Sequence, residues 1–146
     1  MSDCLVLVGV SGSGKEQFSK KFLATDPSYK LCSLKEVKAQ LFGNTRRSDP
    51  KLEWNTMFDK IYSYLAQGKN VLVLDGPPRI RDRKSLISYV SKIEDASVSC
   101  VEFVTDLDTC KKRTPLTNQE FLTEVHNYQS PTVDEGWQGI MRYDGK

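Results

Sequence analysis

A glycine-rich segment that joins an apolar run to a helical pattern is the feature that most constrains the fold. Residues 4–8 form an apolar run, residues 9–15 follow it directly, and Phe18 and Phe22 then share one stripe at helical spacing. A strand is therefore expected to enter a helix through a short glycine turn. This arrangement is typical of α/β proteins, in which helices connect parallel strands.

Further apolar runs alternate with helical patterns along the chain. The predicted strands cover residues 4–8, 30–33, 70–74, 97–104 and 139–143. This alternation predicts an α/β fold, a three-layer sandwich with a mostly parallel sheet of about five strands and helices on both faces. At 146 residues the chain can bury one core but is short for two ordinary domains, so residues 1–146 are expected to form a single domain.

Capping signals mark where several helices begin. Ser33 and Glu36 have the spacing of a capping box, as do Thr117 and Glu120, and Asp49 precedes a proline suited to a first helical turn. The predicted helices cover residues 33–43, 52–67, 82–93, 107–113 and 120–128, besides the one that follows Lys15.

Residues 9–15 read Gly-Val-Ser-Gly-Ser-Gly-Lys, which is the spacing of a phosphate-binding loop. The glycines let successive backbone N–H groups surround an anion, the helix start adds partial positive charge, and Lys15 can reach the outer phosphates. We therefore predict that ATP or another nucleoside triphosphate binds here. The residues expected to hold it are Gly9, Ser11, Gly12, Ser13, Gly14, Lys15, Glu16 and Gln17.

Glu16 is a departure from the usual loop, because most such loops carry at this position a Ser or Thr hydroxyl that ligates Mg²⁺. Its carboxylate could ligate the metal, lie on the helix surface as a partner of the helix dipole, or repel the triphosphate. The surface position is the interpretation that we favour.

Asp75 ends the predicted strand over residues 70–74. Because the carboxyl ends of parallel strands meet at one edge of a sheet, this carboxylate is expected beside the phosphate loop. We predict that Asp75 ligates Mg²⁺, directly or through water. A structural role as a turn or N-cap aspartate is the alternative.

Two basic clusters are expected near the same edge. The first cluster consists of Arg79, Arg81, Arg83 and Lys84, and the second of Lys111, Lys112 and Arg113. The first could meet an anionic acceptor or form a solvated helix face. The second could stabilise a phosphoryl group during transfer, or pair with a helix C-terminus.

Composition indicates an intracellular setting. The longest apolar run is far shorter than the roughly 20 residues of a membrane span, and no signal-peptide pattern precedes it, so a cytoplasmic protein without a membrane partner is expected. A formal net charge of +2 is too small to indicate a nucleic-acid partner by itself. The cysteines form no C-x-x-C pair and are expected to be reduced: Cys4, Cys32, Cys100 and Cys110.

Beyond the loop, the chain resembles the kinase domain of phage and mammalian polynucleotide 5'-hydroxyl kinases and their small stand-alone relatives. The resemblance rests on residues 9–15, 64–71, the strand that ends at Asp75, and 128–137, which is similar to the family's aromatic-x-Pro-x3-Glu-Gly-aromatic ending. It implies a P-loop kinase that uses ATP and Mg²⁺ to phosphorylate single-stranded or nicked 5' ends of DNA or RNA. Lys15, Asp75 and Arg113 would be its catalytic residues.

Residues 74–79 carry a weaker resemblance to adenylate-kinase-type nucleotide kinases, because they are similar to the D-G-F-P-R element of those enzymes. There the arginine holds the acceptor nucleotide's phosphate, which implies this role for Arg79. Those kinases also lack Ser or Thr after the loop lysine. A small nucleoside monophosphate kinase is therefore a further alternative.

The acceptor side departs from the polynucleotide kinase pattern. Where that family has N/S-x-D-x-x-R, residues 33–38 read Ser-Leu-Lys-Glu-Val-Lys. Lys35 thus stands at the position of the general base, and an ammonium with a pKa of about 10.4 cannot accept the proton. Glu36 is the nearest residue that could replace the general base. Lys38 keeps the charge of the family's arginine but lacks the planar guanidinium that binds a phosphate with two hydrogen bonds.

Two functional hypotheses remain open, and the first is the leading one. The first is an active kinase whose acceptor path is lined by Lys35, Lys38, Arg46, Arg47, Arg79 and Arg83. The second is a pseudokinase that binds nucleotide or nucleic acid but has lost the base. The changes at Glu16 and Lys35, together with a lid that keeps only Arg113, favour the second.

Overall fold

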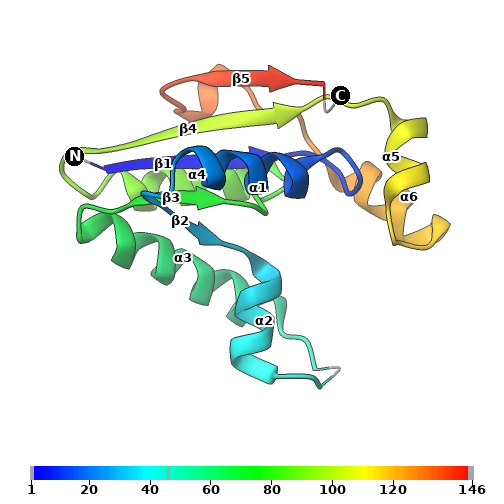
Figure 1. Ribbon diagram of the computed structural model, residues 1–146, viewed down its shortest axis with the longest axis horizontal. Coiled ribbons are helices and arrows are strands. Elements are labelled where there is room, and N and C mark those ends of the chain that lie inside the picture. Colours follow the sequence, from blue (N-terminus) through cyan, green and yellow to red (C-terminus); the bar gives the residue numbers. More distant parts are fainter. Residues whose placement is uncertain (1, 46, 145–146) are drawn as a thin grey trace.

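The computed structural model describes residues 2–45 and 47–144, and its centre is a five-stranded parallel sheet (Figure 1). The strands are β1 (Ser2–Val8), β2 (Tyr29–Cys32), β3 (Asn70–Val73), β4 (Ala96–Phe103) and β5 (Ile140–Tyr143). Their order across the sheet is β2-β3-β1-β4-β5, and every neighbouring pair is parallel. The five predicted strands are thus confirmed.

In the described part of the chain, six α-helices and one short 3-10 helix connect and follow the strands. They are α1 (Lys15–Thr25), α2 (Leu34–Phe42), α3 (Pro50–Ala66), α4 (Ile80–Val90), α5 (Leu107–Arg113), α6 (Asn118–Asn127) and η1 (Val133–Glu135). The predicted caps explain several of the starts. The Asp49 side chain accepts from Leu52 N, and Thr117 and Glu120 form a complete capping box. None of the helices in the described part of the chain has the length and apolarity of a membrane span.

The helices cover both faces of the sheet, as the alternating pattern predicts. Figure 1 shows α1 across one face and α3 and α4 across the other, while α5 and α6 lie beyond the carboxyl ends of the strands. Successive side chains of β1 point to opposite faces of the sheet and so enter different cores. Leu7 packs with Phe18 and Phe22 of α1, whereas Val6 and Val8 belong to the core on the α3 and α4 side.

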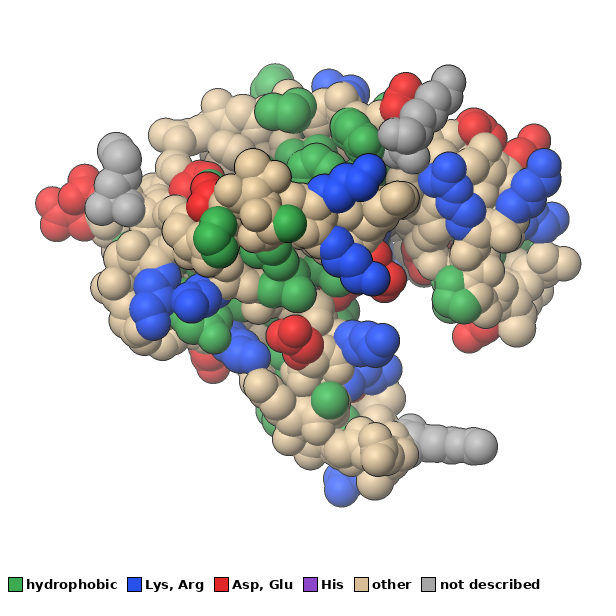
Figure 2. Space-filling model, in the orientation of Figure 1, with side chains coloured by type: hydrophobic (Ala, Val, Ile, Leu, Met, Phe, Trp, Pro, Cys, Tyr) green, Lys and Arg blue, Asp and Glu red, His purple; other side chains and the backbone are tan. Residues whose placement is uncertain are grey.

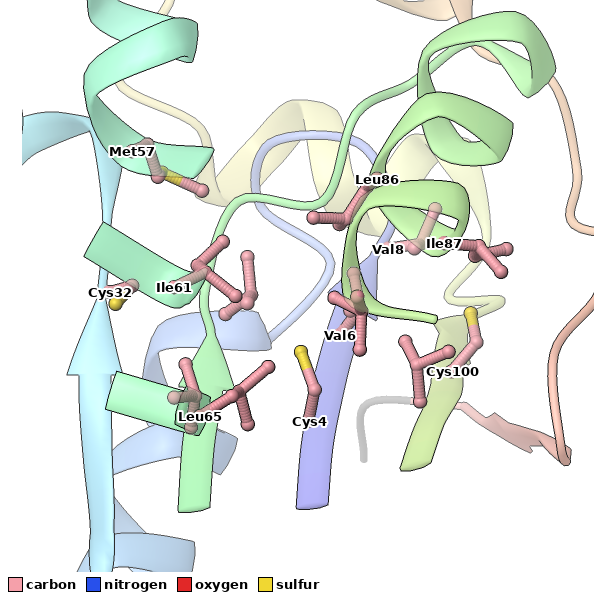
Figure 3. Packing of buried hydrophobic residues seen from close by; sticks show 14 of the residues in the cluster. Cys4, Val6, Val8, Cys32, Met57, Ile61, Leu65, Leu86, Ile87 and Cys100 are labelled. Atoms are coloured by element: carbon pink, nitrogen blue, oxygen red, sulfur yellow. The ribbon is translucent and has the colours of Figure 1, made fainter. Parts of the chain in front are cut away.

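The larger core lies between the sheet and α3 with α4 (Figure 3). Met57, Ile61 and Leu65 recur at helical spacing on one face of α3 and are buried against the strands. All four cysteines are buried free thiols, as predicted. Burial raises the pKa of Cys32 to about 11 and that of Cys100 to about 12, so these thiols stay protonated.

A buried ion pair joins α4 to the C-terminal segment. Arg83 Nε lies 2.6 Å from Glu135 Oε1, and both side chains are fully buried. Arg83 Nη1 also donates to the carbonyls of Pro77 and Pro78, and Trp137 Nε1 donates to Glu135. The Glu-Gly-Trp part of the C-terminal motif therefore holds the end of the chain against α4.

This burial corrects the sequence-based placement of Arg83. The residue was expected to line an acceptor path with the other basic residues near α4, but its guanidinium lies in the core and is held by Glu135. A charge without access to solvent cannot line the path of an acceptor. Arg83 is a structural residue.

The ion pair makes stability depend on pH. Burial raises the pKa of Glu135, but the hydrogen bonds from Arg83 and Thr132 outweigh burial and hold the pKa below its usual value. The stabilisation is therefore complete above the unfolded pKa of about 4.3, and it is lost as pH falls through the lower folded value.

Replacing Glu135 by Gln should lower the free energy of unfolding by about 3 to 5 kcal/mol, because the buried Arg83 charge loses its partner. Urea unfolding followed by circular dichroism measures the loss, and Asp134→Asn, which changes an exposed neighbour, is the matched control. The double variant Arg83→Met with Glu135→Gln should lose less than the two single variants together. Additive losses would contradict a direct pair.

Candidate functional site

The loop between β1 and α1 turns at two glycines with left-handed backbone. Gly12 has φ 83° and Gly14 has φ 106°. A Cβ on Gly12 would lie 2.3 Å from the carbonyl oxygen of Cys110, so only glycine allows α5 to approach the loop this closely. Lys15 Nζ donates to the carbonyl of Gly9 over 2.7 Å and closes the loop. This is the geometry of an anion cradle at a helix start.

A cavity of about 560 Å³ opens in front of this loop at the carboxyl edge of the sheet. Figure 2 shows this side of the molecule hollowed between α2 and the α5–α6 region, with charged side chains gathered around the hollow. The cavity is lined by Ser11, Gly12, Gly14, Lys15, Glu16, Gln17, Lys20, Leu74, Asp75, Arg113, Pro115, Leu116 and Glu124.

Most of the predicted loop residues line this cavity, and two do not. The Ser13 side chain is buried beneath the loop, and its Oγ has no hydrogen-bond partner among the described residues. Its carbonyl accepts from Thr105 Oγ1. Gly9 acts through the carbonyl that holds Lys15. Glu16 is exposed at the rim, which agrees with the surface position favoured for it and leaves its role toward a metal a prediction.

Asp75 reaches the cavity because β3 runs beside β1. The next residue, Gly76, donates its N–H to the carbonyl of Leu7, and a Cβ there would lie 2.6 Å from that oxygen. The close approach fixes Asp75 at the end of β3. One of its oxygens, Oδ2, accepts from the backbone N–H of Leu34 over 2.9 Å. Asp75 thus holds the start of α2 at the cavity.

The charges in the cavity suit a polyanion together with a divalent cation. Burial lowers the pKa of Lys15, and the carboxylates of Asp75, Glu124 and Glu16 partly offset this effect. A bound phosphate would favour the ammonium form further. Magnesium is usually held by one or two carboxylates, substrate phosphates and water, so Asp75 fits as its protein ligand.

Glu124 of α6 is a site residue that the sequence reasoning missed. Its Oε1 accepts from the backbone N–H of Ser11, so a carboxylate already uses one of the loop amides. Ser11 Oγ also bonds to Thr114 Oγ1 over 2.7 Å. The segment that follows α5 is therefore attached to the loop. No local motif identifies Glu124, because only the fold brings α6 to the phosphate loop.

The predicted acceptor residues are not brought together in this cavity. Arg113 lines it, whereas Lys35, Glu36 and Lys38 are exposed on α2 and do not. Arg79 lines a second cavity and donates to Asn127 Oδ1. Two further predicted acceptor residues lie on the segment after α2: Arg47 is exposed and sits over the Phe42 ring, and Arg46 lies outside the described residues.

Comparison with known families identifies the class of protein. Residues 5–118 match the family AAA_33, described as an AAA domain, and the chain belongs to this family. The phosphate loop, the parallel sheet and the helices on both faces are those of a P-loop kinase-type domain. The protein is therefore a kinase-like nucleotide-binding domain, and its family implies a nucleotide and typically Mg²⁺.

Solved structures share this fold at low sequence identity. One is a chain of the Pnkp1/Rnl/Hen1 RNA repair complex, with a TM-score of 0.74 and 18% identity over 86% of this chain and 43% of that chain. A second is Chaetomium thermophilum Kti12 with ADP-AlF3, with a TM-score of 0.76 and 12% identity over 97% and 88% of the two chains. A third is a gluconokinase from Sinorhizobium meliloti 1021, with a TM-score of 0.64 and 16% identity over 97% and 82%.

The protein spans less than half of the repair-complex chain, and no curated protein matches it in sequence. At these identities the structural likeness defines the fold alone. Acceptor and reaction must therefore be argued from the residues of this chain.

Lys15→Ala should weaken ATP binding about 10- to 150-fold, because a charge-assisted hydrogen bond is worth about 1.5 to 3 kcal/mol. Isothermal titration calorimetry with Mg²⁺ and ATP measures the change. Lys21→Ala, on the exposed side of α1, is the matched control and should bind as the wild type does. Unchanged affinity in a folded Lys15→Ala variant would refute the phosphate-loop assignment.

Glu124→Gln should strengthen ATP binding about 3- to 10-fold, because it removes a negative charge from the loop amide that a phosphate would use. The same calorimetry applies, and Asp108→Asn on the exposed side of α5 controls for net charge. Weaker binding in Glu124→Gln would mean instead that the carboxylate holds the loop in its binding conformation.

Proposed function

We propose that the protein is an ATP-dependent phosphotransferase that acts on the 5'-hydroxyl of a polynucleotide or a related nucleotide. The observation that carries the proposal is a single cavity that holds the loop lysine Lys15, the strand-end carboxylate Asp75 and the lid-side Arg113. Phosphoryl transfer needs positioning and charge stabilisation more than covalent chemistry, and these three groups supply both.

The phosphate loop and three side chains of the cavity have roles in this proposal. The loop amides and Lys15 bind the β and γ phosphates, and Asp75 holds Mg²⁺, which would neutralise charge on the transferred phosphoryl group. Arg113 ends α5 at the rim of the cavity, where its guanidinium stabilises charge that grows during transfer.

The hydrogen bond between Asp75 and Leu34 supports the proposed acceptor side. It joins the first residue of α2 to Asp75, which is the metal ligand of this proposal, and it supports an acceptor-activating role for this helix start. In this chain the base position of the polynucleotide kinases is Lys35, and Glu36 is the next residue. The Ser33 side chain accepts from Glu36 N, which caps the helix and leaves the Glu36 carboxylate exposed for proton transfer.

A second candidate function is a pseudokinase that binds nucleotide or nucleic acid without transfer. Two observations favour it: a lysine occupies the base position, and Glu124 uses a loop amide that a phosphate would need. A small nucleoside monophosphate kinase is a further candidate, since Arg79 follows the D-G-P-P element and is held by Asn127.

For each of these candidate functions we propose that the protein is located in the cytoplasm.

Substitutions at the start of α2 separate the first two candidates. If the base is missing, Lys35→Asp should increase transfer from ATP to a 5'-hydroxyl oligonucleotide, by up to the 10²- to 10⁴-fold that general-base catalysis typically contributes. ATP affinity should not change. If Glu36 is the base instead, Glu36→Gln should abolish transfer and Lys35→Asp should have little effect.

Transfer of label from [γ-³²P]ATP measures both variants. Lys21→Gln, which removes a charge from an exposed position of α1 outside the cavity, is the control. An active wild type with both variants near its rate would refute the assignment of this helix start as the acceptor-activating site.

A further inference from the structure

A second cavity, of about 550 Å³, lies between α3 and the start of α4. Its size is within the usual range of small-molecule sites. Four of its residues come from the first turns of α3, five from the beginning of α4 and the turn before it, and one from the end of α6. They are Lys51, Trp54, Asn55, Phe58, Pro78, Arg79, Arg81, Asp82, Ser85 and Asn127.

The lining combines an aromatic wall with a cationic one. Trp54 and Phe58 are one turn apart on α3, and both are only partly buried, with ring centroids 6.2 Å apart in an edge-to-face pair. Lys51, Arg79 and Arg81 supply positive charge, against the single carboxylate of Asp82. The cavity therefore offers an apolar ring surface beside two net positive charges.

Hydrogen bonds preorganise part of the cationic wall. Arg79 Nη2 donates to Asn127 Oδ1 over 3.0 Å, which fixes the guanidinium at the junction of α4 and α6. Arg81 is differently placed. Its side chain is 81% exposed and lies 3.7 Å from Asp82, a surface contact that a stronger anionic partner can replace.

We infer that this cavity binds a nucleotide, with the base against Trp54 and Phe58 and a phosphate held by Arg79 and Arg81. A base needs an aromatic face to stack on, and its phosphate needs a cation beside that face, so the two walls match the two halves of one ligand. Asn55 and Ser85 supply polar atoms for the base edge. Neither wall alone would define this chemistry.

The position of the cavity gives the nucleotide a role, and this step rests on the proposed function. Asp75 lines the first cavity and Arg79 the second, and the four Cα–Cα steps from one to the other span at most about 14 Å. A nucleotide in the second cavity would therefore lie near the phosphate loop, and on the proposed function its hydroxyl is the group that accepts the phosphoryl group. The acceptor path inferred here runs between α3 and α4. Trp54 and Arg81 belong to it, whereas Arg83, which the sequence predicted on the path, is buried.

Trp54→Leu should weaken binding of a 3'-fluorescein, 5'-hydroxyl single-stranded hexanucleotide about tenfold or more, because it removes the stacking surface. Fluorescence anisotropy with the full chain and without ATP measures this affinity. Tyr64→Leu, another partly buried aromatic of α3 that does not line the cavity, is the matched control and should bind as the wild type does.

Arg81→Ala keeps the test decisive if Trp54→Leu does not fold, because an exposed side chain contributes little to stability. The variant should weaken binding of the hexanucleotide. It should also reduce the slope of the logarithm of affinity against the logarithm of salt concentration by about one, which corresponds to the loss of one phosphate contact. Lys92→Ala, beyond the other end of α4, should change neither. Wild-type affinity and salt dependence in both Trp54→Leu and Arg81→Ala would overturn the inference.

Competition with AMP distinguishes the two sources of the ligand. Displacement of the hexanucleotide by AMP at similar concentration would support the cavity and assign a free nucleotide to it. Displacement only by unlabelled oligonucleotide would support it and assign a polynucleotide end. Lys15→Ala should leave hexanucleotide binding intact, so a failure of the phosphate-loop assignment and a failure of this cavity give different results.

Discussion

Parallel pairing of β1 with both β3 and β4 is the constraint on which the site depends. Val6 pairs with Val73 and Val8 pairs with Glu102, so the three strands end at one edge of the sheet. The phosphate loop, Asp75 and the entry to α5 are the segments that follow these ends. Buried apolar side chains on both faces of the sheet maintain this register, because a slip by one residue would move each of them to the opposite face and away from the neighbours against which it packs.

The C-terminal motif contributes to the site indirectly. Its carboxylate, Glu135, binds Arg83, and Arg83 in turn donates to the carbonyls of Pro77 and Pro78. These prolines belong to the connection that has Asp75 at one end and Arg79 at the other. The segment that resembles a kinase signature thus holds the connection between the two cavities from the core. None of its residues lines either cavity.

Much of the fold could be predicted because its signals are local. Apolar runs marked the strands, and the caps at Asp49 and Thr117 marked helix starts to within a residue or two. The phosphate loop and Asp75 were also readable, since each follows directly from the end of a strand. Arg83 and Glu124 were not. Arg83 is buried by a partner 52 residues away, and Glu124 reaches the loop only through the packing of α6.

The same limit applies to the acceptor side. Basic residues that lie close together in the sequence give no indication of which of them meets solvent, so the sequence did not separate Arg79, Arg81 and Arg83 by burial. In the fold one is held by Asn127, one is exposed and one is buried. The aromatic pair on α3 carried no functional signal until α4 was seen beside it.

The central claim is that the phosphate loop delivers a phosphoryl group rather than only binding a nucleotide. Its most direct test is transfer from [γ-³²P]ATP, with Mg²⁺, to a panel of 5'-hydroxyl oligonucleotides and nucleotides. Label is expected on the 5' position of an acceptor, and none is expected with the Lys15→Ala variant. A wild-type protein that binds ATP yet labels no acceptor in the panel would contradict the claim.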